Sequence, residues 1–180
     1  PNAGLTHQRT YAVAIGTGSG QTNQGTSAVA VGVGSGSVGQ GTNAVAIGAS
    51  AGYTGQEQFS VAIGSSAGQT NQGQYGIAIG ENSGSSNQGT HGIAIGLNAG
   101  QLNQGSSGIA IGYLAGSHDQ QMKSVAIGKN AGTYKQNYHG IAIGSSTGKT
   151  NQGTDAIAIG YRAGGDNQGS YSIAIGSYAG

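Results

Sequence analysis

The sequence predicts an all-β parallel β-solenoid, a β-roll with one sixteen-residue coil per repeat. Three observations lead to this fold class. The chain of 180 residues aligns on itself every sixteen positions without a gap. Small and β-branched residues alternate over five positions of each repeat, and Gly recurs at two fixed positions. A strict period whose unit is too short to bury a core alone is typical of stacked repeat architectures.

Each repeat position is numbered 1 to 16, the residue number minus multiples of sixteen. Positions 12–16 read small, Val or Ile, Ala, Val or Ile, Gly, and this alternation predicts a strand. Gly at positions 16 and 4 of every copy brackets a turn, since Gly accepts a positive φ without a steric clash. Position 9 is Gly in seven of eleven copies and predicts a further corner, with a second strand around position 8.

Position 8 is Gln in every copy. Amides stacked in register can donate to and accept from the amides above and below, as Asn and Gln do in cross-β structures. The predicted role is structural, as a ladder of Gln8, Gln24, Gln40, Gln56, Gln72, Gln88, Gln104, Gln120, Gln136, Gln152 and Gln168.

The alternation divides each predicted strand into two faces. We expect the Val and Ile of positions 13 and 15 to form two aliphatic ladders inside the coil. The small residues of positions 12, 14 and 16 then have two interpretations: the opposite wall of a thin roll fills this side, or copies of the chain pack together on it. We favour the second, with an oligomer face at Ala14, Ala30, Ala46, Ala62, Ala78, Ala94, Ala110, Ala126, Ala142, Ala158 and Ala174.

The chain is glycine-rich, with 39 Gly, and carries six Lys or Arg and five Asp or Glu. So few cations, scattered over the repeats, exclude a nucleic-acid surface. No apolar run is long enough to insert into a membrane. The four His and five acids show no metal-site or acid–base spacing, and GSSTGKT at residues 144–150 is one residue short of a phosphate loop. We therefore expect no enzymatic activity, no cofactor and no metal.

The phrase SVAIG at residues 60–64 and 124–128, each time followed by a Gly-bounded turn, resembles the head repeat of trimeric autotransporter adhesins, the YadA-like or haemagglutinin-type repeat. It is also similar to repeats of tail-fibre-like proteins of phages and large viruses. The resemblance implies a left-handed parallel β-roll assembled as a homotrimer, with Val and Ile inside the roll and the small residues toward the partner chains. It also implies a place on a cell or virion surface.

We therefore predict a structural and adhesive fibre segment, extracellular or on a cell or virion surface, whose partners are copies of itself and a host receptor or glycan. Residues 1–180 are expected to form a single solenoid of about eleven repeats, uncapped and part of a longer array. The expected ligand contacts are aromatic residues at position 11, because such rings stack on sugars and proteins: Tyr11, Phe59, Tyr75 and Tyr171.

Two alternative functions remain at this stage. One is a self-assembling extracellular filament, in which the array continues and the role is mechanical. The other is an ice-binding solenoid with ranks of Thr at positions 6 and 10, as in Thr6, Thr10, Thr22 and Thr26. These ranks are interrupted, for example by Val38 and Leu102, which argues against an ice lattice.

Overall fold

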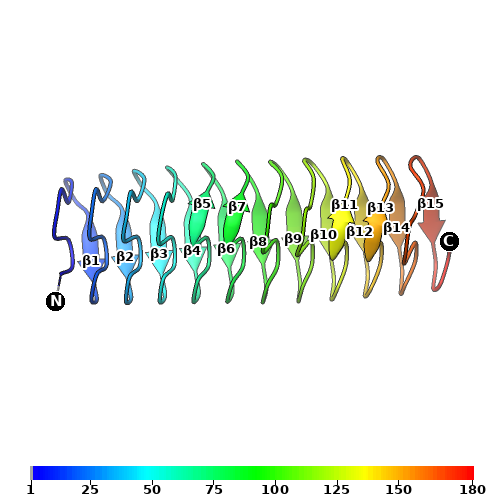
Figure 1. Cartoon of the computed structure of the whole chain (residues 1–180), viewed down its shortest axis with the longest axis horizontal. Coiled ribbons are helices and arrows are strands. Elements are labelled where there is room, and N and C mark those ends of the chain that lie inside the picture. The colour runs from blue at the N-terminus through cyan, green and yellow to red at the C-terminus, as the bar shows by residue number, and fades with distance from the viewer. Residues whose placement is uncertain (1) are drawn as a thin grey trace.

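The computed structural model describes residues 2–180, and over these residues it contains fifteen short strands and no helix. The chain winds into a stack of coils along one axis, with its two termini at opposite ends (Figure 1). Strands of successive coils pair in parallel with partners sixteen residues apart. The predicted fold class, an all-β parallel solenoid with sixteen-residue coils, is confirmed.

One parallel sheet of eleven strands runs the length of the stack. In this sheet Ala46 pairs with Ala30 on one side and with Ala62 on the other. Each strand covers repeat positions 13–15, as the alternation of small and β-branched residues predicted: β1 (Val13–Ile15), β2 (Val29–Val31), β3 (Val45–Ile47), β4 (Val61–Ile63), β6 (Ile77–Ile79), β8 (Ile93–Ile95), β9 (Ile109–Ile111), β10 (Val125–Ile127), β12 (Ile141–Ile143), β14 (Ile157–Ile159) and β15 (Ile173–Ile175).

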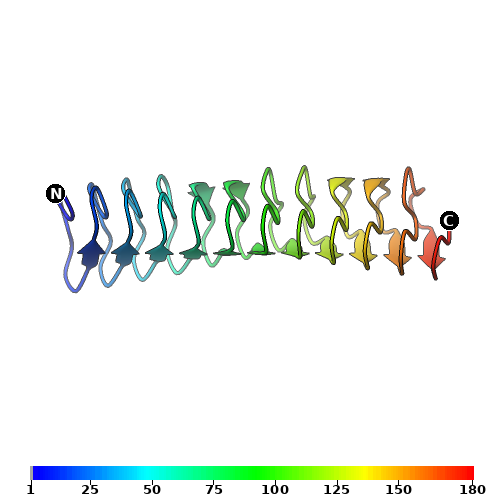
Figure 2. The same cartoon turned by 90° about the horizontal axis from the view of Figure 1, so that it is seen from below.

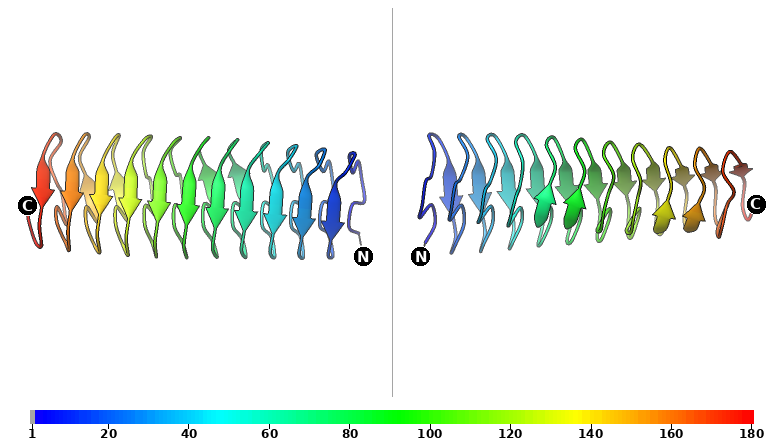
Figure 3. Two further views of the ribbon diagram at one scale, coloured as in Figure 1. Left: turned by 180° about the vertical axis from the view of Figure 1, so that it is seen from behind. Right: turned by 45° about the horizontal axis from the view of Figure 1, so that its top comes forward.

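Repeat positions 6–8 form a second, weaker line of pairing. Four coils contain a strand there, in two separate pairs: β5 (Thr70–Gln72) with β7 (Ser86–Gln88), and β11 (Tyr134–Gln136) with β13 (Thr150–Gln152). Other coils pair at position 6 through single parallel bridges, such as that between Leu102 and His118. The short strands lie on the opposite side of the stack from the large sheet (Figures 2 and 3). The predicted second strand is thus present as a strand in four coils, and in most of the others it is reduced to a single parallel bridge with the next coil.

The two fixed glycines of each repeat occupy places where a side chain does not fit. Gly96, at position 16, has a φ of +126°, and a Cβ added there would lie 2.8 Å from the carbonyl oxygen of Gly112 in the next coil. Gly100, at position 4, has a φ of +51°, and its added Cβ would lie 2.8 Å from Oε1 of Gln104. Backbone conformation and close approach therefore both require Gly at these turns.

The interior of each coil is lined by small residues. Ala78 and its equivalents from Ala30 to Ala158 are fully buried, and they pack with the buried Ala of position 3, such as Ala67. The two arms of the coil are close together, because a Cβ added at Gly84 would lie only 3.2 Å from Cβ of Ala78. A coil this thin has no room for branched side chains, so the Val and Ile point outward from the sheet.

The predicted orientation of the strand was therefore wrong. Val and Ile do not fill the coil, and the small residues do not form an oligomer face. The opposite wall of a thin roll fills the small side, which is the other interpretation of the sequence. The residues wrongly assigned to an oligomer face are Ala14, Ala30, Ala46, Ala62, Ala78, Ala94, Ala110, Ala126, Ala142, Ala158 and Ala174. Ala14, in the first coil, is half-buried, and all the others are buried.

Candidate functional site

Most Gln of position 8 lie inside the coil, where their amides link parts of the stack. Nε2 of Gln104 donates to the carbonyl oxygen of Ile93 at 2.8 Å, to that of Gly108 at 3.1 Å and to Oε1 of Gln120 at 3.2 Å. This amide thus joins the strand before it, its own corner and the next coil, whereas Gln40 and Gln72 donate only to backbone carbonyl oxygens. Gln8 is exposed in the first coil, whereas every Gln from Gln24 to Gln152 is buried.

The amide-to-amide bonds divide the Gln ladder into three segments. They join Gln24 to Gln40, then Gln56 to Gln72, and then run from Gln88 to Gln168. The Oε1 atoms of Gln56 and Gln88 have no hydrogen-bond partner within the described part of the chain. Where the amide-to-amide bond is missing, Nε2 still donates to the backbone. Nε2 of Gln72, for example, donates to the carbonyl oxygen of Val61 at 2.8 Å. The ladder lies inside the coil, where its hydrogen bonds hold neighbouring strands and corners together.

The outer side of the large sheet is an aliphatic face, which we define as the Val and Ile of positions 13 and 15 in all eleven strands. Its members are partly or largely exposed: 36% of the surface of Ile79 and of Ile143 is accessible, and 39% of that of Ile47. Because successive strands are in register, the exposed side chains form two continuous rows along the stack. Contiguous exposed apolar surfaces of this kind are typical of interaction sites.

The corner at position 11 carries a stack of aromatic rings. Phe59, Tyr75 and His91 have ring centroids 5.2 and 5.1 Å apart and planes within 6° and 9° of parallel. All three residues have a φ between 57° and 60°, the left-handed conformation of the corner. Of the four predicted ligand contacts, the structure brings Phe59 and Tyr75 together, while Tyr11 and Tyr171 are exposed in the first and last coils.

Sequence reasoning missed the contribution of His91 to this stack. The signal was present, because His91 shares repeat position 11 with Phe59 and Tyr75 and follows Tyr75 by one coil. An imidazole ring is flat and can continue a stack of phenyl rings.

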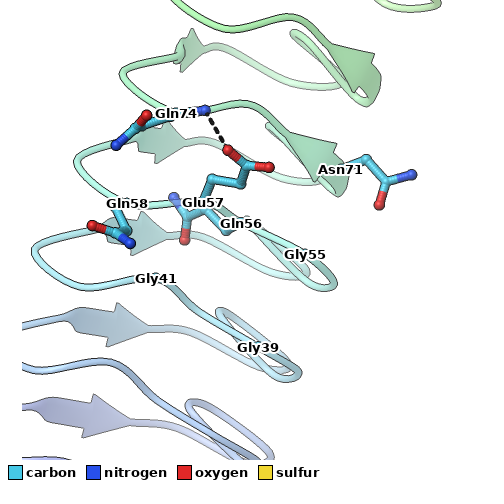
Figure 4. A pocket seen from close by; sticks show the side chains of 8 residues that line it. All are labelled: Gly39, Gly41, Gly55, Gln56, Glu57, Gln58, Asn71 and Gln74. Carbon is cyan, nitrogen blue, oxygen red and sulfur yellow. Dashed lines mark hydrogen bonds between the residues drawn. The ribbon is translucent and has the colours of Figure 1, made fainter.

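A groove opens beside this corner, on the side of the stack that carries the short strands. We call it the glycine groove, a hollow of about 550 Å³ whose lining residues are Gly39, Gly41, Gly55, Gln56, Glu57, Gln58, Asn71 and Gln74 (Figure 4). Oε2 of Glu57 accepts a hydrogen bond from the backbone N–H of Gln74 at 3.1 Å. Sequence reasoning missed this site too; its signals were Gly at position 7 in two successive copies and an acid at position 9.

Ionisable groups are sparse across the molecule. His139 Nδ1 and Asp155 Oδ1 lie 3.0 Å apart at the exposed corner of position 11. Among residues 2–180 no three His, Cys, Asp or Glu side chains gather in a way that holds a metal ion. The same residues contain no helix of the length and apolarity needed to cross a membrane.

Comparison with known proteins finds one family whose repeat matches part of the chain. The family model of the YadA head domain repeat matches residues 72–99, in two copies. The matched segment includes strands β6 and β8, which pair in register with their neighbours on both sides. No curated protein and no solved structure matches the chain. The family model agrees with the resemblance of the SVAIG repeats to YadA-like heads.

Proposed function

We propose, from the YadA head repeats at residues 72–99, that this chain is a segment of an adhesin-type fibre on an exposed cell or virion surface. The observation that carries the proposal is the aliphatic face, which extends along the whole stack and which nothing within the described residues covers. The fibre acts as a rigid support, and its outward corners make the contacts with other molecules.

The proposed occupant of the aliphatic face is a second and third copy of the same chain. Each copy presents two straight rows of Val and Ile along its stack, so identical copies aligned side by side bring row against row over their full length. Burying apolar surface stabilises the assembly by about 25 cal/mol per Å². The family of the matched repeats assembles as homotrimers, which favours three chains around a common axis. In that assembly Val and Ile face the partner chains, and the small residues remain inside each coil.

Two acidic substitutions on this face test the assembly. We expect the wild-type chain to sediment as a trimer, and Ile79→Glu combined with Ile111→Glu to sediment as a monomer, because a carboxylate buried between chains without a partner is strongly unfavourable. The measurement is analytical ultracentrifugation at several protein concentrations.

The matched control places the same charges on another side of the coil. Leu97 and Tyr113, at position 1, are exposed to a similar degree as Ile79, at 41% and 44% of their surface. Leu97→Glu combined with Tyr113→Glu is expected to leave the trimer intact. A wild-type chain that stays monomeric at every concentration would contradict the proposal, and so would an Ile79→Glu, Ile111→Glu variant that remains a trimer.

The outward corners of position 11 are the proposed contact surface for a receptor. Phe59 and Tyr75 lie at these corners and are exposed. The residue at position 11 varies from coil to coil, whereas the residues at interior positions are nearly invariant along the chain. Rings fixed in a stack lose little side-chain freedom on binding, which favours their use as contacts.

A further inference from the structure

A row of exposed amides runs along position 7 and stops at the glycine groove. Nδ2 of Asn71 donates to Oδ1 of Asn87, and Nδ2 of Asn87 to Oδ1 of Asn103, each at 3.1 Å. In the two coils before Asn71 this position is Gly39 and Gly55. A Cβ added at Gly39 would have no heavy atom within 4 Å. The missing side chains therefore leave space open on the surface.

The backbone at these two glycines is the same as at the Asn positions. Gly39 and Gly55 have φ values of +68° and +67°, and Asn71 has a φ of +53°, all in the left-handed region. Asn is among the residues that adopt this conformation readily. An Asn at Gly39 would thus fit the coil without a clash. At Gly55 the added Cβ would lie 3.0 Å from Oδ1 of Asn71, so an Asn there would also require the Asn71 side chain to move.

Polar side chains surround the floor of the glycine groove. Glu57 replaces the Gly that most copies have at position 9, and the bond from the backbone N–H of Gln74 fixes its carboxylate. The side-chain amides of Gln58, Asn71 and Gln74 each offer both donors and an acceptor. Figure 4 shows Glu57 between Gln58 and Gln74 on one side and Asn71 on the other.

The aromatic stack of position 11 adjoins, in the chain, the polar residues of position 10 that line this hollow. Phe59 follows Gln58 directly and is the first ring of the Phe59–Tyr75–His91 stack. Tyr75 covers one face of the Phe59 ring, while the residue one coil earlier, on the other side, is Asn43. The electron-rich face of an aromatic ring attracts the weakly positive C–H groups of a sugar ring.

We propose that the glycine groove binds a neutral oligosaccharide. A carboxylate and three amides, set around a backbone floor, match the closely spaced hydroxyl groups of a sugar, which both donate and accept. Phe59 is not part of the lining, but it lies one residue beyond Gln58 and offers its ring to the C–H face of a sugar that extends out of the groove. The volume of about 550 Å³ lies in the range of small-molecule sites. This inference rests on the proposed surface function, since it names the chemical class that the fibre contacts.

The hollow continues toward the N-terminus, which suits a chain of sugars better than a single one. A second hollow of about 200 Å³ shares Gly39, Gly41 and Gln58 with the first, and Arg9 lies at its far side. Three residues in common make the two hollows one groove along the axis of the stack. The preference for uncharged sugars comes from the main hollow, where Glu57 is the one charged residue of the lining.

Other ligand classes fit the groove less well. A peptide cannot join it as an added strand, because the coil backbone is already paired: the N–H of Gly41 donates to the carbonyl oxygen of Gln56, and that of Glu57 to that of Gln72. An apolar ligand would meet a lining made mostly of polar side chains and backbone. Glu57 repels acidic sugars and phosphates, and a single carboxylate does not hold a metal ion.

The test is binding of the wild-type chain to an array of immobilised glycans that includes neutral, sialylated and sulphated members. We expect binding to neutral oligosaccharides. The best neutral member is then measured in solution by isothermal titration calorimetry.

Three variants remove parts of the groove by restoring the residue found in other copies of the repeat, so that each is compatible with the coil. Gly39→Asn combined with Gly55→Asn fills the floor, Glu57→Gly removes the carboxylate, and Phe59→Ser removes the first ring. Each is expected to weaken binding at least tenfold. The matched controls are Gln121→Gly, at position 9 of a distant coil, and Tyr134→Thr, which removes an exposed ring at position 6, where other copies have Thr; both are expected to bind as the wild type does.

Several results would overturn the inference: no glycan bound, binding of the acidic members alone, or neutral-glycan binding that the groove variants leave unchanged. Equal binding to a glycoprotein before and after enzymatic removal of its glycans would show recognition of polypeptide and would also overturn it. Sedimentation of the same samples separates the two proposals. A trimer that binds no glycan contradicts only the groove, whereas a chain that never associates contradicts the proposed fibre assembly.

Discussion

Gln104→Leu is expected to lower the free energy of unfolding by about 3 to 5 kcal/mol, because it leaves several buried acceptors without a donor and each costs about 1–3 kcal/mol. The acceptors are the carbonyl oxygens of Ile93 and Gly108 and Oε1 of Gln120. Leu has nearly the volume of Gln, so packing changes little. The measurement is urea unfolding followed by circular dichroism, at one fixed protein concentration because the chain is proposed to associate.

The control for this variant is the neighbouring amide on the surface. Asn103 belongs to the exposed row of position 7 and has a φ of 55°, which Gly also adopts, so Asn103→Gly removes an amide ladder bond without strain. Its expected effect is within about 1 kcal/mol, since exposed hydrogen bonds exchange with water. Equal effects of the two substitutions would contradict the assignment of the buried ladder as the main polar support of the coil.

Ala78→Ile is expected to destabilise the chain by about 3 kcal/mol or more, at or above the upper end of the usual cost of overpacking a core. Ala78 is fully buried, and the opposite arm approaches so closely that a Cβ added at Gly84 would lie 3.2 Å from its Cβ. The three extra carbons of Ile have no space there unless the arms separate. Thermal unfolding of the purified variant measures the loss.

The adjacent residue provides the matched control. Ile79 is partly exposed on the aliphatic face, so Ile79→Val is expected to cost no more than about 1.5 kcal/mol. If the strand were turned over, with Val and Ile inside, Ala78→Ile would be tolerated and Ile79→Val would leave a cavity. The order of the two effects therefore decides which face of the strand lies inside the coil.

The sequence predicted the architecture well, because the features that define it are strictly periodic. The alternation at positions 13–15 predicted strands such as β6, and the sixteen-residue register predicted the pairing of Ala78 with Ala94. The stacking of Gln104 on Gln120 is equally a consequence of this register.

The sequence did not determine which face of the strand points inward. Alternation shows that Ala78 and Ile79 lie on opposite faces, but the thickness of the coil decides which one fits inside. That thickness depends on the arm across the coil, where Gly84 leaves room only for Ala at position 78. The rule that branched aliphatic residues fill a core failed here, because so thin a coil leaves the larger apolar side chains on its outer surface.

The glycine groove was beyond prediction for a different reason. It depends on the absence of side chains at Gly39 and Gly55. In the sequence alone, a Gly in place of Asn at one repeat position looks the same as ordinary surface variation. The Phe59–Tyr75 stack was easier to anticipate, since both residues occupy position 11 of successive copies.

The stacked glycines of position 16 also limit how such a chain changes in evolution. Because Gly96 touches the backbone of Gly112 with no space for a side chain, inserting or deleting one residue within a copy would push a larger residue into that contact. Recombination between copies that adds or removes a whole repeat preserves every contact. Chains of different lengths can therefore arise by duplication of complete units, whereas the insertion or deletion of a single residue inside a unit would disrupt the stack.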